Sequence, residues 1–214
     1  MNLGEIVTTI SRRLGDPAIL KADIVTEVNK KLLLIAGQVR MPPLIKANEA
    51  ITVNAGDTSV SMPSDYHHDL LAVWDNTNGG EPTIRLNRSS LYKSYNRSET
   101  SSRVNEVAVE GSVLWVRPKV SQNVELLVDY YRMPQTLTND SDIPEGIPPD
   151  LHHDLLVCGP LAELLPDSPD DYPVKERRKS YNIDRFANGI GMLKNVYPHA
   201  PRMRVVLRRR VREF

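Results

Sequence analysis

Apolar residues in the first fifteen positions recur every three or four residues, which places them on one face of a helix. Ile6, Ile10 and Leu14 form this stripe, while Asn2 precedes it and Gly15 follows it. Asparagine is favoured at the start of a helix, and glycine accepts the left-handed conformation that ends many helices. The pattern therefore predicts a helix that Asn2 caps and that runs to Leu14.

Three further helices follow from the same spacing. One runs from about Asp23 to Val39 and ends before the two prolines that follow. Another covers Asp150 to Leu165, where Gly159-Pro160 must introduce a kink. The last begins at Pro173, a residue suited to a first helical turn, and reaches about Lys194. Their apolar positions are Ile24, Val28, Leu32, Ile35, Val39, Leu151, Leu155, Leu161, Leu164, Leu165, Ile183, Phe186, Ile190 and Leu193.

Between about Ala50 and Tyr131 the apolar period changes to two, which is the spacing of a half-buried strand. The alternating runs are separated by turn sequences such as Ala55-Gly56-Asp57 and Asn78-Gly79-Gly80. Glu110-Gly111-Ser112 joins two such runs and predicts a hairpin. Residues 89–95 predict a brief helical stretch between strands. Short strands at this spacing are typical of an antiparallel barrel or sandwich.

The order of these elements predicts an α+β fold. Residues 1–45 and 148–197 supply helices that pack into one bundle, because the simplest arrangement brings both helix pairs together. Residues 46–147 form an antiparallel β-barrel or sandwich module inserted between them. Residues 198–214 form an extended C-terminal arm.

The last thirteen residues, 202–214, combine six arginines with apolar residues in rough alternation, and two nearby prolines separate them from the last helix. An extended segment of this kind exposes backbone hydrogen-bonding groups and apolar side chains that it cannot bury on itself. We expect it to add a strand to another protein, over a reach of about 40 Å at about 3.3 Å per residue. The expected docking residues are Arg202, Arg204, Val205, Leu207, Arg208, Arg209, Arg210, Val211, Arg212 and Phe214.

The 214-residue chain carries 27 basic and 27 acidic residues, and this neutrality hides an asymmetry. The arm holds six arginines against Glu213, which leaves a body with 21 basic and 26 acidic residues. A charge run alone is typical of a nucleic-acid-binding tail, so an accessory protein that binds nucleic acid is the alternative function. The consecutive Val205-Val206-Leu207 favours a protein groove, because an electrostatic arm gains nothing from buried valines.

Composition excludes several classes of protein. Cys158 is the only cysteine, so neither a disulfide framework nor a cysteine-based zinc site is expected. The charged residues Glu5, Arg12 and Arg13 leave no apolar core for a signal peptide. No apolar run approaches the roughly 18 residues of a membrane span, so we expect a soluble protein with no membrane partner. No phosphate loop or dinucleotide fingerprint is present, and no cofactor is expected.

A doubled motif supplies four of the five histidines. His67-His68-Asp69 is nearly repeated as His152-His153-Asp154. Two such clusters could build the binuclear site of a metal hydrolase, which is a third hypothesis for the function. Adjacent histidines, however, diverge by about 100° on a helix and point to opposite faces of a strand. We therefore expect no metal ligands, no catalytic residues and no enzymatic activity.

Three other features have structural interpretations. Cys158 lies in an apolar helix and is expected to be a small core residue rather than a nucleophile. Gly189-Ile190-Gly191 is expected to allow close helix packing or to end the helix. The basic cluster Lys175, Arg177, Arg178 and Lys179 is interpreted as an exposed face of the last helix.

One pattern combines the hairpin V-A-V-E-G-S-V-L-W-V-R-P at 107–118, the strand at 124–129, and Tyr130-Tyr131-Arg132-Met133-Pro134 followed by Leu137. In this pattern the chain resembles the head-to-tail adaptor proteins of tailed bacteriophages. The resemblance extends to a second helix that contains Asn29 and to a helix entered at P-x-D-L. Pro160 and the doubled histidine motif depart from the family pattern.

The resemblance implies a structural virion protein at the capsid vertex, assembled in the host cytoplasm. Family members form a ring, usually of twelve subunits, that binds beneath the portal and joins it to a downstream tail or nozzle protein. A C-terminal extension inserts between portal subunits, and DNA passes through the ring without sequence-specific binding. Residues 202–214 of this chain occupy the place of that extension.

Overall fold

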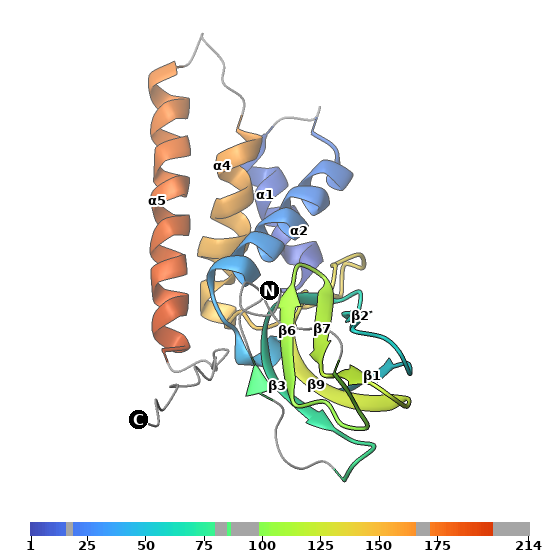
Figure 1. The fold of residues 1–214 in the computed structure, drawn as a ribbon. Coiled ribbons are helices and arrows are strands. Elements are labelled where there is room, and N and C mark those ends of the chain that lie inside the picture. Colours follow the sequence, from blue (N-terminus) through green and yellow to red (C-terminus); the bar gives the residue numbers. More distant parts are fainter. Residues whose placement is uncertain (16–18, 80–84, 87–98, 166–171, 199–214) are drawn as a thin grey trace, which may run out of the picture. The chain divides into compact units, whose positions relative to one another are not determined.

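The computed structural model describes residues 1–15, 19–79, 85–86, 99–165 and 172–198 (Figure 1). The predicted α+β class is confirmed. The described residues belong to two compact units, one built from 1–44 and the part of the chain after 132, the other from 45–132. The arm from residue 199 onward and the predicted helix at 89–95 lie outside the described residues.

Helix α1 spans Leu3–Leu14, as its apolar period predicts. The side chain of Asn2 accepts a hydrogen bond from the backbone of Glu5, and the Glu5 carboxylate accepts one from the backbone of Asn2. This reciprocal pair satisfies two of the donors that a helix start leaves unpaired. Gly15 ends the helix with a φ of 63°, a conformation that suits glycine. Leu3, Ile6 and Ile10 are buried.

Helix α2 spans Lys21–Gln38 and begins two residues before the predicted start. A short turn of helix, η1, follows at Pro42–Leu44. Asp23 stabilises the start of α2, because its carboxylate accepts a hydrogen bond from the backbone N–H of Leu20 at 3.3 Å.

The predicted kink at Gly159-Pro160 belongs to a longer irregularity. A 3₁₀ turn, η2, spans Pro149–Leu151, a π-helical segment, η3, spans His153–Cys158, and α4 spans Gly159–Leu164. Pro160, which has no N–H to donate, lies just after the π-helical segment. The wider π turn brings residues five apart onto one face.

Helix α5 spans Tyr172–Val196 and packs closely against η3 and α4. A Cβ atom on Gly189 would lie 2.9 Å from Leu155 Cδ2, and one on Gly159 would lie 2.7 Å from the Phe186 ring. The expectation that Gly189 allows close packing is therefore confirmed. Around Gly191 no atom of the described residues lies within 4 Å of the equivalent position.

The β unit contains two main sheets around a shared apolar core. The first sheet has the order β1–β9–β3 with antiparallel pairs, and the second has the order β2–β7–β6–β4. The predicted hairpin is β6–β7, whereas the short pairs β4–β6 and β5–β8 are parallel. The strands are β1 Ile45–Val53, β2 Ser59–Ser61, β3 Tyr66–Asp75, β4 Arg85–Leu86, β5 Thr100–Ser101, β6 Glu106–Glu110, β7 Val113–Arg117, β8 Lys119–Val120 and β9 Val124–Arg132.

Residues 133–147, which the sequence pattern groups with the β module, contact the helices in the structure. The backbone N–H groups of Leu3 and Gly4 donate to the carbonyl oxygens of Asp142 and Asp140 at 2.9 and 3.0 Å. These carbonyls satisfy donors that the start of α1 cannot pair internally. In the described part of the chain, no helix combines the length and apolar character that crossing a membrane requires.

Candidate functional site

The first histidine pair lies on β3 and does not follow the geometry expected of a regular strand. His67 Nδ1 and His68 Nδ1 are 2.6 Å apart, although neighbours on a strand should point to opposite faces. That expectation is wrong here because β3 is irregular. Its register against β9 shifts at both histidines, and Asp69 has a φ of 48°. The contact requires at least one of the two Nδ1 atoms to be unprotonated.

Packing constrains both rings of this pair. His68 stacks on Tyr131 with ring centres 5.0 Å apart and an interplanar angle of 3°. Burial lowers the pKa of His67 from its usual value, which favours its neutral form. The pair is thus a packed, hydrogen-bonded part of the β unit.

The second pair, His152 and His153, separates into two different environments. His152 is only 1% exposed, and its Nε2 donates to the carbonyl oxygen of Ile147 at 2.8 Å. Its Nδ1 lies 2.9 Å from the amino group of Met1. Burial lowers the pKa of His152 despite the hydrogen bond to Ile147. With both ring nitrogens engaged, His152 has no nitrogen left to ligate a metal.

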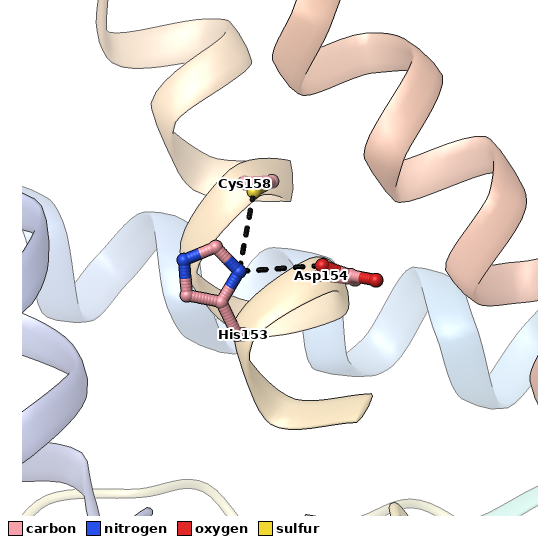
Figure 2. Close-up of side chains that lie close together, drawn as sticks. All are labelled: His153, Asp154 and Cys158. Carbon is pink, nitrogen blue, oxygen red and sulfur yellow. Dashed lines mark hydrogen bonds and ion pairs between the residues drawn. The ribbon is translucent and has the colours of Figure 1, made fainter. Parts of the chain in front are cut away.

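His153 belongs instead to a cluster with Asp154 and Cys158 (Figure 2). His153 Nδ1 lies 3.2 Å from Asp154 Oδ1 and 3.8 Å from Cys158 Sγ. The π-helical segment η3 creates this cluster, because its wider turn brings residues 153 and 158 together. Sequence reasoning missed it, since a regular helix predicts contacts at spacings of three and four.

The cluster holds donor types that bind zinc, all within 4.8 Å of one another. Its surroundings oppose a cation. Arg185 donates to Asp154 Oδ1 from Nε at 3.0 Å and from Nη2 at 2.6 Å. The positive charge of Arg13 acts on Cys158 and lowers the pKa of its thiol, against the larger effect of burial. Two guanidinium groups beside three donors raise the electrostatic cost of a divalent ion there.

The same cluster lacks the geometry of a nucleophilic relay. In a cysteine–histidine–aspartate relay the carboxylate orients the ring through one nitrogen while the other faces the thiol. Here both Asp154 and Cys158 face the same nitrogen, Nδ1, as the converging contacts in Figure 2 show. Burial raises the pKa of the fully buried Cys158 thiol, which keeps it protonated. The cluster therefore fits a set of polar contacts that links η3 to α5. Cys158 is a core residue, as predicted.

A second polar network holds the β unit together. Tyr130 Oη donates to Asp65 Oδ1 at 2.6 Å, and Lys46 Nζ lies 3.2 Å from both Asp65 Oδ2 and Glu49 Oε2. Burial alone would raise the pKa of Asp65, but the hydrogen bonds from Tyr130 and Lys46 outweigh it and lower this pKa. The network ties β1, β9 and the turn before β3.

The structure leaves the predicted docking arm without a description. Arg202, Arg204, Val205, Leu207, Arg208, Arg209, Arg210, Val211, Arg212 and Phe214 all lie outside the described residues. Of the basic cluster on the last helix, Arg177 and Arg178 are exposed on α5, as interpreted from the sequence, whereas Lys179 is half-buried.

Comparison with known families gives one match that spans almost the whole chain. The family described as "SU10 adaptor protein" matches residues 1–210 and so includes both compact units. A comparison with curated proteins found no match. The match agrees with the resemblance carried by the hairpin at 107–118 and by the strand that follows it. The chain therefore belongs to the SU10 adaptor protein family.

Proposed function

We propose that this protein is a structural head-to-tail adaptor of a tailed bacteriophage. In this proposal it forms a ring that docks on the portal through residues 202–214 and links the portal to a downstream tail or nozzle protein. DNA passes through the ring without sequence-specific binding, and no step requires an enzymatic activity. The observation that carries the proposal is the family match over residues 1–210.

Assembly is supported by apolar side chains that the described residues leave exposed on the helical unit. Leu33 and Leu34 on α2 are 44% and 40% exposed. On α5, Ile183, Met192 and Val196 are each about half exposed. Helix surfaces of this composition are suited to burial against another subunit. In the proposed ring, which usually has twelve subunits in this class of protein, neighbouring copies cover these faces.

The arm would dock by combining charge pairing with apolar insertion. Its six arginines would pair with carboxylates or carbonyl oxygens of the portal, and its interleaved apolar residues would fill a groove. Each ring contributes many arms, so after the first has docked the others bind at a high effective concentration. Contacts that are individually modest then add up to a stable joint.

A truncation tests the docking role directly. The chain ending at residue 201 and the full chain are each mixed with purified portal rings, and binding is measured by sedimentation. We expect the truncated chain to lose binding. A control in which the four apolar docking residues are replaced by serine retains the arm's charge and separates apolar insertion from charge pairing. Undiminished binding by the truncated chain would refute the docking role.

The alternative function, a nucleic-acid-binding accessory protein, predicts a different response. Its arm would bind duplex DNA with an affinity that falls steeply with salt, and the slope would decrease as arginines are removed. The adaptor proposal predicts weak DNA binding together with rings in negative-stain images of the protein or of its portal complex. The two measurements thus separate the two functions.

A further inference from the structure

A groove lies in the helical unit between the C-terminal ends of α1 and α4 and the N-terminal part of α5. Its volume is about 660 Å³. The structure describes eight of the lining residues, of which four are arginines and none is acidic. The lining residues are Arg12, Arg13, Leu161, Leu165, Arg177, Arg178, Tyr181 and Asn182. Among the described lining residues, the groove therefore gathers positive charge without a carboxylate.

Two distant parts of the sequence build this arginine groove. Arg12 and Arg13 lie in the last turn of α1, where the helix dipole favours cations. Arg177 and Arg178 come from α5 and are exposed. Each pair alone resembles an ordinary solvated helix surface. Only the packing of both α1 and α5 against α4 brings the two pairs together.

The base of the arginine groove is ordered by burial. Leu161 is 1% exposed and Asn182 is 6% exposed, so the base is part of the packed interior. A groove with a packed base binds at a lower entropic cost than a surface that must first become ordered.

The side-chain chemistry selects an anionic occupant. A guanidinium group presents a planar fork of donors that matches a carboxylate or a phosphate, and bidentate pairs are the stronger ones. Four like charges around one groove repel one another until an anion enters. The occupant should therefore carry at least two negative charges.

The remaining lining residues favour a protein over DNA. Leu161 and Leu165 offer an apolar base, which phosphates do not use, and Tyr181 is 56% exposed at the wall. Arginine and tyrosine are the residues that dominate binding energy at protein interfaces. We propose that the arginine groove binds an acidic, extended segment of a partner protein. Its carboxylates would pair with the four arginines, and an apolar side chain between them would rest on the two leucines.

The described lining residues belong to α1, to α5 and to the region of α4, so the groove would give each adaptor subunit an attachment in addition to the one proposed for the C-terminal arm. The probe is a fluorescein-labelled heptapeptide of alternating glutamate and leucine, with a matched peptide in which glutamine replaces glutamate. Binding is followed by fluorescence anisotropy. Because the arm itself carries six arginines, the full chain and the chain ending at residue 201 are both measured.

The test variant is R177Q/R178Q, and the control variant is R103Q/K194Q. The control removes the same charge from two exposed positions outside the groove. We expect the test variant to lose at least about tenfold in affinity for the acidic peptide, with and without the arm, because hydrogen bonds to charged groups are involved. The control should lose less than about twofold. Thermal melts by circular dichroism check that both variants fold.

Several results would overturn the proposal. The first is equal binding of the acidic and glutamine peptides, and the second is equal loss in the two variants. A duplex DNA that binds through Arg177 and Arg178, and that the acidic peptide does not displace, would assign the groove to phosphates. Self-association that R177Q/R178Q abolishes, without peptide binding, would assign it to a second copy. If only the variant D167N/D170N/D171N binds the peptide, the occupant of the groove is the chain's own linker between α4 and α5.

The portal and peptide measurements test the two proposals separately. If truncation at residue 201 abolishes portal binding and the truncated chain still binds the peptide, both proposals stand.

Discussion

Asn29 and Leu137 exchange two hydrogen bonds although 108 positions separate them. The Asn29 side-chain amide donates to the Leu137 carbonyl at 2.9 Å, and the Leu137 N–H donates to the Asn29 side-chain oxygen at 2.8 Å. One asparagine on α2 thus pairs both backbone groups of a buried residue in the connector. This reciprocal pair fixes residues 133–147 to the helices.

Replacing Asn29 with alanine should destabilise the protein by about 1–3 kcal/mol, because a buried N–H and a buried carbonyl of Leu137 lose their partners. The free energy of unfolding is measured with urea. N188A, at an exposed position on α5, controls for the change in helix propensity. Equal stability of N29A and N188A would show that water replaces the lost partner and that the pair has no net effect.

Two glycine-to-alanine substitutions should have opposite effects on stability. G159A should destabilise by about 1–3 kcal/mol, because its Cβ would lie 2.7 Å from the Phe186 ring. G191A should stabilise by up to about 1 kcal/mol, because no described atom lies within 4 Å of its Cβ position and alanine favours a helix. Thermal unfolding of both variants tests the close approach of α5 to α4. Stabilisation of both would mean that the helices are further apart.

Local elements could be predicted from the sequence where the apolar period and the residues that start and end the element indicate the same bounds. Asn2, the apolar stripe of α1 and Gly15 all indicate the same helix, and the structure confirms its bounds. The β6–β7 hairpin was likewise evident from its alternation and its central glycine. These features depend on neighbouring residues alone.

Features that depend on irregular backbone or on distant packing could not be predicted in this way. The contact of His67 with His68 needs the shifted register of β3, and the His153–Cys158 contact needs a π turn. The arginine groove needs α1 and α5 to lie on either side of α4, which no local pattern encodes. Arg177 and Arg178 were correctly interpreted as exposed, yet their partners on α1 became evident only in the fold.

Acid should weaken the network around Asp65. The pKa of Asp65 is lowered in the fold from an ordinary value of 3.8, because the hydrogen bonds from Tyr130 and Lys46 outweigh burial. A carboxyl group whose pKa is lower in the folded protein than in the unfolded chain stabilises the fold at pH values above its unfolded pKa. This stabilisation is lost as the pH falls below 3.8 and passes the folded pKa. Because Asp65 is about one-third exposed, solvent screens the pair and reduces the effect.

D65N should therefore be less stable than the parent at neutral pH by about 1 kcal/mol. The difference should shrink as pH falls below 3.8, where the parent also loses the charged carboxylate. Urea unfolding over this pH range gives the unfolding free energy of the parent and of D65N. Y130F removes one donor to Asp65, so its unfolding free energy at neutral pH should lie between those of the parent and D65N. If the stability difference between D65N and the parent stays constant down to the pH of acid unfolding, ionised Asp65 does not stabilise the fold through this network.

His152 should give the protein a second pH dependence at a milder pH. Burial lowers its pKa below the ordinary 6.5, so the neutral ring is the stable form in the fold. A histidine whose pKa is lower in the folded protein than in the unfolded chain stabilises the fold at pH values above its unfolded pKa. That stabilisation is lost as the pH falls below 6.5 towards the folded pKa. His67 has the same direction of shift and therefore contributes to the same slope.

H152A should be less stable than the parent at neutral pH by about 2–4 kcal/mol, because it leaves a cavity and removes the donor to the Ile147 carbonyl. Its stability should also fall less steeply than that of the parent below pH 6.5. H67A is the matched variant, and the double variant should lose more of the slope than either single one. Unfolding free energies measured in steps from neutral pH to below 6.5 decide the question. If H152A and the parent show the same dependence of unfolding free energy on pH, His152 takes up its proton in the folded protein as readily as in the unfolded chain. Its buried contacts with Met1 and Ile147 would then have to open at mildly acidic pH.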